Sequence, residues 1–253
     1  MIASPFDLTG RTAVVTGASR GIGLGMAGAL AAAGADVIAV ASRPLEVGSA
    51  VERAVTGHGR RFTARHADFA DVDAVVALGD ELAALDVDIL INNAGTIERA
   101  PAAEHPLEAW RRVIDVDLTS HFALTQKLAG PMLDRGDGRV IFTASLLSFQ
   151  GGITVPGYAA AKSGIAGLTR ALSNEWVGRG VTVNAIAPGY IATDNTQALQ
   201  DDPDRSRSIL ERIPAGRWGR ADDLGGATVF LASAAAAYVS GIVLPVDGGW
   251  LAR

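Results

Sequence analysis

Hydrophobic residues along the chain form short β-branched runs that alternate with longer, alanine-rich stretches of helical periodicity. The runs predict strands at residues 12–15, 37–40, 61–65, 89–91, 140–143, 181–186 and 242–246. The stretches between them predict helices at residues 22–33, 44–55, 72–85, 107–133, 159–177, 204–212 and 221–231. Strands that alternate with helices favour a parallel sheet covered on both faces, so we expect an α/β fold with a doubly wound sheet of about seven strands.

Composition narrows the class of protein. No linker rich in Gly, Ser or Pro interrupts the chain, so we expect one domain over residues 1–253. The formal net charge is −5 and no basic run is present, which argues against nucleic acid as a partner. The absence of cysteine excludes disulfides and thiolate chemistry, and we expect no metal site. Without a signal-like start or an apolar run of about 18 residues, we expect no membrane association and a cytoplasmic location.

A glycine-rich turn follows the first predicted strand and reads Thr-Gly-Ala-Ser-Arg-Gly-Ile-Gly over residues 16–23. Gly17 permits a tight turn, Gly21 lets the backbone approach a phosphate, and Gly23 allows the next helix to pack closely. The helix N-terminus adds free N–H groups and the positive end of a helix dipole. The turn therefore predicts a site for the diphosphate of a dinucleotide. The other turn residues assigned to this site are Ser19, Arg20 and Ile22.

Tyr158 and Lys162 lie four residues apart in a predicted helix, so they share one of its faces. A tyrosine is a poor acid or base near neutral pH, because its reference pKa is about 10. A neighbouring ammonium group favours the phenolate and lowers that pKa toward the working range. Ser145 follows the fifth predicted strand, and its hydroxyl is suited to hold a substrate oxygen. The alternative is an ordinary surface pair and a helix cap.

Taken together and in this order, these motifs resemble those of the short-chain dehydrogenase/reductase family. The resemblance covers essentially the whole chain and rests on the glycine-rich turn, Asn92-Asn93-Ala94-Gly95, Ser145, Tyr158-x-x-x-Lys162 and Pro188-Gly189. It implies a Rossmann fold, NAD or NADP as cofactor, and a homo-oligomer, commonly a tetramer. It implies that Tyr158 donates the proton, that Lys162 modulates Tyr158 and binds the ribose, and that Ser145 holds the carbonyl. The other cofactor contacts that it implies are Asp68 beside the adenine, Asn93, Ala94 and Gly95 along the cleft, Pro188 and Gly189, and Ile191 and Thr193 at the nicotinamide carboxamide.

Asp117 departs from the family pattern, because many members have an asparagine at this place in the helix after the fourth strand. Its backbone carbonyl could serve as that of asparagine does, but its carboxylate would oppose Lys162. At an assumed separation of about 6 Å and an effective dielectric constant of about 20, a unit charge contributes roughly 3 kcal/mol, or about two units in the pKa of a tyrosine. We expect Asp117 to move the activity optimum to higher pH, unless it is protonated or points away.

The end of the second predicted strand bears on the choice between NAD and NADP. Members specific for NAD commonly have an aspartate there that binds the ribose hydroxyls. This chain has Ala41, followed by Ser42 and Arg43, which could receive a 2′-phosphate. The position before Pro44 could equally aim Arg43 into solvent. The chemistry leans toward NADP and leaves the choice open.

Segments of the second half resemble the members of the family that act on sugar acids such as 2-dehydro-3-deoxygluconate. These segments are residues 145–152, 184–193, 195–197, 213–219 and 246–253. A sugar acid needs a cation for its carboxylate and donors for its hydroxyls. The candidates in loops that should border the cleft are Arg99, Gln150, Asn195, Arg217 and Arg220. The open alternatives are another carbonyl substrate, such as a 3-oxoacyl thioester or a polyol, and a non-catalytic nucleotide sensor on the same fold.

Overall fold

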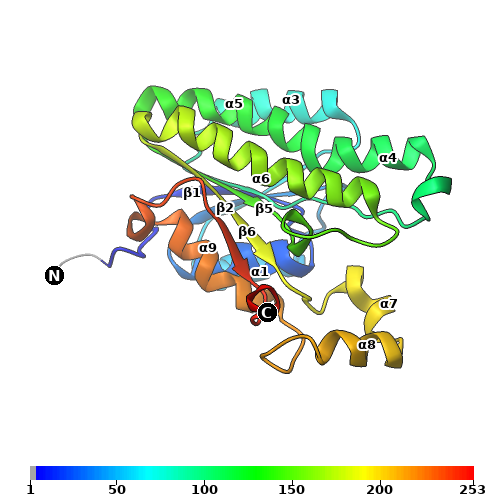
Figure 1. Cartoon of the computed structure of the whole chain (residues 1–253). Helices are drawn as coiled ribbons and strands as arrows, with labels where there is room; N and C mark the ends of the chain where they lie inside the picture. Colours follow the sequence, from blue (N-terminus) through cyan, green and yellow to red (C-terminus); the bar gives the residue numbers. More distant parts are fainter. Residues whose placement is uncertain (1–3) are drawn as a thin grey trace.

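Within residues 4–253, which the computed structural model describes, seven parallel strands form one sheet in the order β3-β2-β1-β4-β5-β6-β7 (Figure 1). The strands are β1 (Thr12–Thr16), β2 (Asp36–Ala41), β3 (Phe62–His66), β4 (Ile89–Asn92), β5 (Gly138–Thr143), β6 (Val181–Pro188) and β7 (Val243–Val246). Every neighbouring pair is parallel. The doubly wound sheet predicted from the sequence is therefore confirmed.

Helices cover both faces of the sheet (Figure 1). One face is covered by α1 (Gly21–Ala32), α2 (Ala50–Thr56) and α9 (Gly225–Ala232), and the other by α3 (Val72–Ala83), α4 (Leu107–Ile114), α5 (Ser120–Arg135) and α6 (Pro156–Trp176). Two short helices, α7 (Gln197–Gln200) and α8 (Pro203–Leu210), stand apart from both layers. None of the helices in the described part of the chain is long and apolar enough to cross a membrane.

Alternate residues of the central strands enter two separate apolar layers. In β1, Val14 packs into the layer under α5, while Val15 packs into the layer under α1. Both side chains are fully buried, as expected for a parallel strand that is covered on both faces. The apolar, often β-branched runs of the central strands reflect this double burial.

The carboxyl ends of the strands meet at one edge of the sheet. The register pairs Val15 with Ile91, Asn92 with Phe142 and Thr143 with Ile186. The strand order reverses between β1 and β4, because the chain crosses from the β3 edge to the other side of β1. Ligands of doubly wound sheets bind beyond the carboxyl ends at this switch point, which places the candidate site there.

Three predicted helices differ from those observed. The helix predicted at residues 221–231 begins as a 3₁₀ turn at Ala221–Leu224, which precedes α9. The helix predicted at residues 44–55 begins only at Ala50, because Gly48 adopts a φ of +75° and the Ser49 side chain caps α2 by accepting a hydrogen bond from Glu52 N. The single helix predicted at residues 107–133 is interrupted by a π-helical turn at Asp115–Thr119. Such turns are common at functional sites, and this one contains Asp117.

Candidate active site

The N-terminus of α1 is open to a ligand. Arg20, at the position before the helix, makes no side-chain cap, and the first turn has no acidic residue. By contrast, α2, α3 and α8 are capped by Ser49, Asp71 and Asp202. The uncapped N–H groups and the positive dipole end of α1 are suited to a diphosphate. The glycine-rich turn therefore fits the dinucleotide cofactor that the sequence predicts.

Gly17 and Gly23 hold this turn tightly against the start of α1. Gly17 has a φ of +65°, in the region that favours glycine. A Cβ atom at Gly23 would lie 2.3 Å from the Gly17 carbonyl oxygen and 2.5 Å from Asn93 Nδ2. No side chain fits there, because the Gly17 oxygen belongs to the backbone of the turn itself.

Replacing Gly23 with Ala should open the turn and prevent cofactor binding. We expect a loss of about 1–3 kcal/mol or more in the free energy of unfolding, the usual cost of overpacking. Chemical denaturation measures the stability, and NADPH fluorescence measures binding. Gly28→Ala is the matched control in the same helix, since its Cβ would meet the Cβ of Ala54 at an ordinary 3.7 Å and should add up to about 1 kcal/mol of stability. Binding by Gly23→Ala at the wild-type level would contradict this account.

Thr16 and Asn93 tie together the ends of β1, β4 and β5. Thr16 Oγ1 accepts hydrogen bonds from the backbone N–H groups of Asn93 and Ala94, each at 2.9 Å. Asn93 Nδ2 donates to the carbonyls of Thr16 (3.0 Å) and Gly17 (3.4 Å), and its Oδ1 accepts from Thr143 Oγ1 at 3.2 Å. Asn93 thus holds the floor of the cleft with bonds to the protein. Thr16 opens the predicted turn, but its role as an acceptor was not predicted, and neither was Thr143, because both roles depend on the strand order.

Ser145 is fixed just beyond β5 by the short helix that follows it, η3 (Leu146–Ser148). Its Oγ accepts the N–H of Leu147 at 3.2 Å. Ser148 Oγ accepts the N–H of Ser145 at 3.3 Å and donates to the carbonyl of Lys162 at 2.6 Å. The sequence analysis also missed Ser148, which links the Ser145 turn to α6.

Tyr158 and Lys162 lie on the inner side of α6, as their spacing predicts. Lys162 is only 2% exposed, and its Nζ donates to the carbonyl of Thr143 at 2.9 Å. The same Nζ lies 5.5 Å from the centroid of the half-buried Tyr158 ring. The structure therefore brings Ser145, Tyr158 and Lys162 to the same end of β5.

Asp117 forms a buried ion pair with Lys162. Its side chain is fully buried, Oδ2 lies 3.3 Å from Lys162 Nζ, and Oδ1 accepts the N–H of Thr96 at 2.8 Å. Burial raises the pKa of Asp117 above its ordinary value, while Lys162 and the Thr96 N–H act in the opposite direction. The possibility that Asp117 points away is wrong. A Cβ at Gly95 would lie 3.2 Å from Asp117 Oδ2, which explains the glycine there.

His121 is a further buried polar residue near the site that the sequence analysis missed. It is fully buried in α5, with its ring stacked on Phe142 and edge-on to Phe69. Burial and the charge of Lys162 lower the pKa of His121 to about 3, partly offset by the Ala94 carbonyl. The imidazole is therefore neutral at neutral pH. No motif marks it, because its burial follows from packing.

The remaining residues predicted to contact the cofactor surround the open end of α1. Ser19 and Arg20 are exposed in the turn, and Ile22 packs against the apolar layer under α1. Ser42 and Arg43 are exposed just beyond β2, and the exposed Asp68 accepts the N–H of Ala70. Pro188 ends β6, and Gly189 packs closely against Asp247. Ile191 is buried and pairs through its backbone with Gly219, while Thr193 lies against Gly21.

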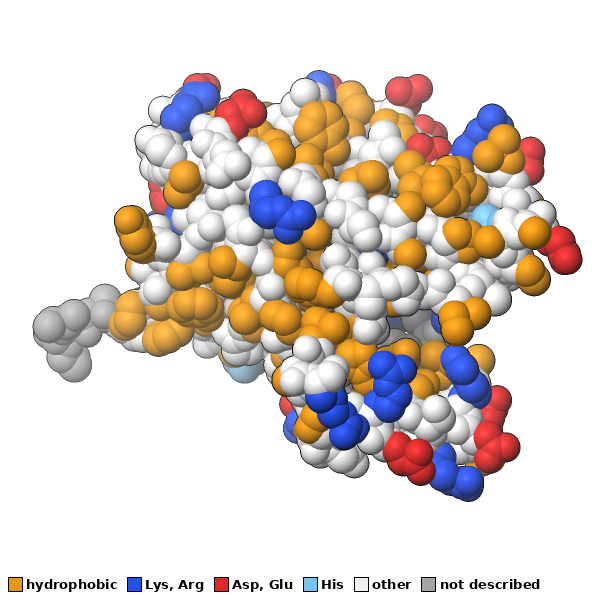
Figure 2. All heavy atoms as spheres, in the orientation of Figure 1, with side chains coloured by type: hydrophobic (Ala, Val, Ile, Leu, Met, Phe, Trp, Pro, Cys, Tyr) orange, Lys and Arg blue, Asp and Glu red, His pale blue; other side chains and the backbone are white. Residues whose placement is uncertain are grey.

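The residues predicted to bind substrate separate into two groups. Arg217 donates to both oxygens of Asp223, at 2.7 and 2.9 Å, and is already paired within the protein. Within residues 4–253, the exposed side chains of Arg99, Asn195 and Arg220 make no hydrogen bond to the protein. Asn195 lies in the segment with α7 and α8, where charged side chains gather (Figure 2).

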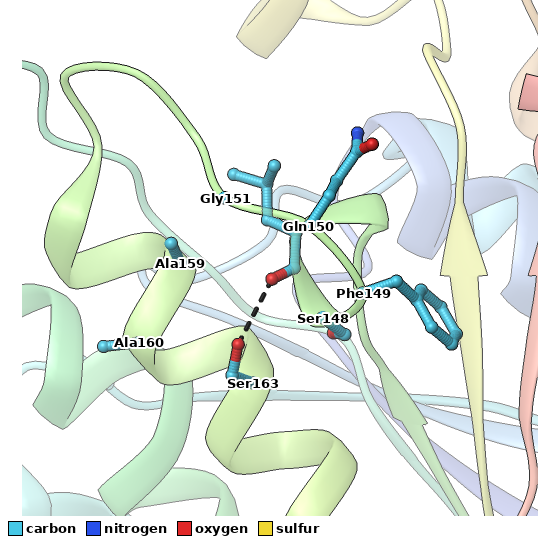
Figure 3. A pocket seen from close by; sticks show the side chains of 8 residues that line it. Ser148, Phe149, Gln150, Gly151, Ala159, Ala160 and Ser163 are labelled. Carbon is cyan, nitrogen blue, oxygen red and sulfur yellow. Dashed lines mark hydrogen bonds between the residues drawn. The ribbon is translucent and has the colours of Figure 1, made fainter. Parts of the chain in front are cut away.

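Gln150 lies beside a shallow pocket between the Ser145 loop and α6 (Figure 3). Ala159, Ala160 and Ser163 line it from the helix, and Ser163 Oγ donates to the Leu147 carbonyl at 3.2 Å. The side chains of Phe149 and Gln150 point away from α6. Because Tyr158 and Lys162 do not line this pocket, it is distinct from the catalytic cleft.

Comparison with known proteins shows to which family the chain belongs. The family model described as enoyl-(acyl carrier protein) reductase matches residues 17–251. A 2-dehydro-3-deoxy-D-gluconate 5-dehydrogenase from Pseudoalteromonas atlantica is 58% identical over 98% of both chains. The chain belongs to the short-chain dehydrogenase/reductase family. The resemblance inferred from the motifs is confirmed, and this short-chain dehydrogenase/reductase is an NAD(P)-dependent oxidoreductase that acts on a CH–OH group.

Solved structures of relatives share the fold of this short-chain dehydrogenase/reductase. One from Agrobacterium tumefaciens, with bound NADP, is 51% identical, has a TM-score of 0.94, and is matched over 99% of this chain and 100% of its own. A gluconate 5-dehydrogenase from Burkholderia cenocepacia, in complex with NADP and tartrate, is 38% identical with a TM-score of 0.92 over 98% of both chains.

Proposed function

We propose that this enzyme interconverts the 5-hydroxy and 5-keto forms of 2-dehydro-3-deoxy-D-gluconate, with NADP as its preferred cofactor. The observation that carries the substrate assignment is the 58% identity to a dehydrogenase of that compound over nearly the full length of both chains. The buried Asp117–Lys162 pair beside Tyr158 supports hydroxyl–carbonyl chemistry at this site.

The residues of the chain handle the substrate oxygen and its proton, and bound NADP supplies the hydride acceptor or donor. The Oγ of Ser145 already accepts the Leu147 N–H, so its own proton is available to donate to the substrate oxygen. Tyr158 takes the hydroxyl proton in oxidation and returns it in reduction. Lys162 is held by the Thr143 carbonyl, and its positive charge stabilises the phenolate.

The substrate carboxylate needs a cation at the mouth of the cleft. We propose Arg99 or Arg220, whose guanidinium groups are exposed and unpaired within the described residues, with Gln150 and Asn195 as candidates for the hydroxyl groups. A guanidinium binds a carboxylate through two parallel hydrogen bonds, which a lysine does not reproduce. Arg217 ranks behind these two, because Asp223 already accepts two of its hydrogen bonds.

NADP preference is assigned to Ser42 and Arg43, because the end of β2 has no carboxylate to bind ribose hydroxyls and Arg43 is exposed there. Replacing Arg43 with Ala should raise KM for NADPH about tenfold or more, since a hydrogen bond to a charged group contributes about 1.5–3 kcal/mol. KM for NADH should stay unchanged, because NADH has no 2′-phosphate. Steady-state kinetics with both cofactors measures the effect, with Arg170→Ala on the exposed face of α6 as control. An equal change for both cofactors would contradict the assignment.

A panel of substrates tests the proposed activity. The purified protein is assayed with 2-dehydro-3-deoxy-D-gluconate, gluconate and a polyol in the oxidising direction, and with a 3-oxoacyl thioester in the reducing direction. We expect kcat/KM for 2-dehydro-3-deoxy-D-gluconate to exceed that for every other compound. A higher value for the thioester or the polyol would overturn the substrate assignment and leave the chemistry in place.

We also propose that the enzyme is a single-domain protein that acts in the cytoplasm as a homotetramer. Tyr238 is fully exposed beside β7, and Phe122 and Val177 expose apolar surface on the opposite layer. Two separate apolar areas suit an assembly with two kinds of contact. Light scattering measures the mass of the assembly in solution.

A further inference from the structure

The segment that contains α7 and α8 packs on the rest of the protein through Leu199 and Ile209 and makes further contacts at both of its ends. This segment, residues 193–212, is called the lobe here, and α7 and α8 within it stand apart from the two helix layers (Figure 1). It begins next to the glycine-rich turn and ends next to the C-terminal residues of the chain.

The far end of the lobe is firmly anchored. The guanidinium of Arg212 lies 3.9 Å above the ring of Trp250, which is 4% exposed. Trp250 packs in turn on Tyr190, with ring centroids 4.8 Å apart. Arg253 donates to the carbonyls of Glu211 and Arg212, which follow the end of α8. Buried aromatic packing and hydrogen bonds together fix this end.

The near end follows Ile191, which is fixed by its backbone bridge to Gly219 and accepts a hydrogen bond from Thr196 Oγ1 at 2.7 Å. This end also carries an exposed ion pair. Arg20 Nη1 donates to Asp194 Oδ2 at 2.7 Å, and the two side chains are 70% and 69% exposed. Thr193 lies directly over Gly21, where a Cβ would be 3.4 Å from its methyl group. Exposed pairs of this kind change an equilibrium by at most about fivefold. This contact can therefore break and form again while the far end stays fixed.

The ion pair spans the place where a diphosphate would bind. Arg20 immediately precedes α1, whose N-terminal N–H groups are uncapped, and Asp194 reaches across from the lobe. A guanidinium has five N–H donors, and Asp194 occupies Nη1, so Nη2 and Nε remain available to a phosphate oxygen. Arg20 can serve the carboxylate and the phosphate at the same time.

We propose that Asp194 is a positioning residue for the cofactor: by pairing with Arg20, it holds the guanidinium of Arg20 at the start of α1 and slows cofactor release. The proposal rests on the proposed NADP site and adds a role that the hydride-transfer chemistry does not require. Asp194 does not contact the reacting atoms, so the chemical step is independent of it.

Stopped-flow measurement of NADPH release tests the proposal. Each protein is loaded with NADPH and mixed with excess NADP⁺, and the loss of NADPH fluorescence gives the release rate. Asp194→Asn should release NADPH about two- to fivefold faster than the wild type, and Asp194→Glu should restore slow release. The single-turnover rate of hydride transfer at saturating NADPH should be the same in all three. At about 1 M salt the difference in release should disappear, because screening removes the ion pair.

Two controls separate the ion pair from a general effect on the lobe. Asp204→Asn removes a carboxylate from another exposed pair of the lobe, Asp204 with Arg207, and should leave release unchanged. In an Arg20→Gln background, Asp194→Asn should have no further effect. Unchanged or slower release from Asp194→Asn overturns the proposal, the slower case showing that Asp194 repels the phosphates. Wild-type protein that binds no NADPH overturns both this inference and the proposed function.

Discussion

Tyr158→Phe should lower kcat by about 10²–10⁴-fold, the usual contribution of a positioned acid–base group, while NADPH affinity changes little. The substitution removes the phenolic oxygen that exchanges the proton and keeps the ring, which lies 5.5 Å from Lys162 Nζ. Steady-state kinetics and cofactor titration measure the two effects separately.

Tyr190→Phe is the matched control for this variant. Tyr190 packs between Trp218 and Trp250 in the small apolar cluster under the lobe, so its substitution tests the loss of a phenolic hydroxyl outside the catalytic turn. We expect kcat to stay within about twofold of the wild type. A Tyr158→Phe enzyme with nearly full turnover would show that another group handles the proton.

Asp117→Asn should move the pH–rate profile to lower pH by about one to two units. The Asp117 carboxylate lies 3.3 Å from Lys162 Nζ and offsets its positive charge. At an assumed separation of about 6 Å and an effective dielectric constant of about 20, a unit charge contributes roughly 3 kcal/mol. Removing that negative charge leaves the ammonium free to stabilise the phenolate, so the phenolate forms at lower pH. The same direction holds for oxidation and reduction. An unmoved profile would show that Asp117 carries no charge at working pH.

The pH dependence of the stability of Asp117→Asn independently tests the direction of the shift in the pKa of Asp117. Burial raises the pKa of Asp117 in the folded protein above the ordinary value of 3.8. The folded state therefore binds this proton more tightly than the unfolded state, and the wild type loses stability as the pH rises from 3.8 through the raised pKa. The Asp117→Asn variant has no carboxyl group at this position, so its stability should not fall in this way as the pH rises. Chemical denaturation between pH 4 and pH 8 compares the two slopes; identical slopes would contradict the raised pKa.

The sheet was predictable because the central strands are buried on both faces and therefore consist largely of apolar, often β-branched residues. The helix boundaries were less so: the start of α2 depends on a left-handed glycine at position 48 and a cap at Ser49, which a hydrophobic pattern does not reveal. The π-helical turn at Asp115–Thr119 was equally hidden, since its residues continue the helical periodicity on either side.

The candidate site was predictable where a motif fixes spacing along one element. Tyr158 and Lys162 share a face because one helix carries both. The contacts that hold them come from other elements: Thr143 from β5, and Asp117 from the turn between α4 and α5. Only the strand order brings these residues together. The sequence therefore predicted that Asp117 opposes Lys162, but it did not predict their direct contact. The pairing of Arg217 with Asp223, six positions further on, was not predicted, because no motif marks it.

The most direct test of the central claim follows the hydrogen at carbon 5 of the substrate. 2-Dehydro-3-deoxy-D-gluconate carrying deuterium at this carbon is incubated with the enzyme and NADP⁺, and both products are analysed by mass spectrometry. The account predicts that the deuterium appears in the reduced nicotinamide and that the sugar acid becomes the 5-keto compound. Reduced cofactor without deuterium would show that the hydride comes from another carbon. Cofactor binding with no transfer from this compound would contradict the proposed substrate.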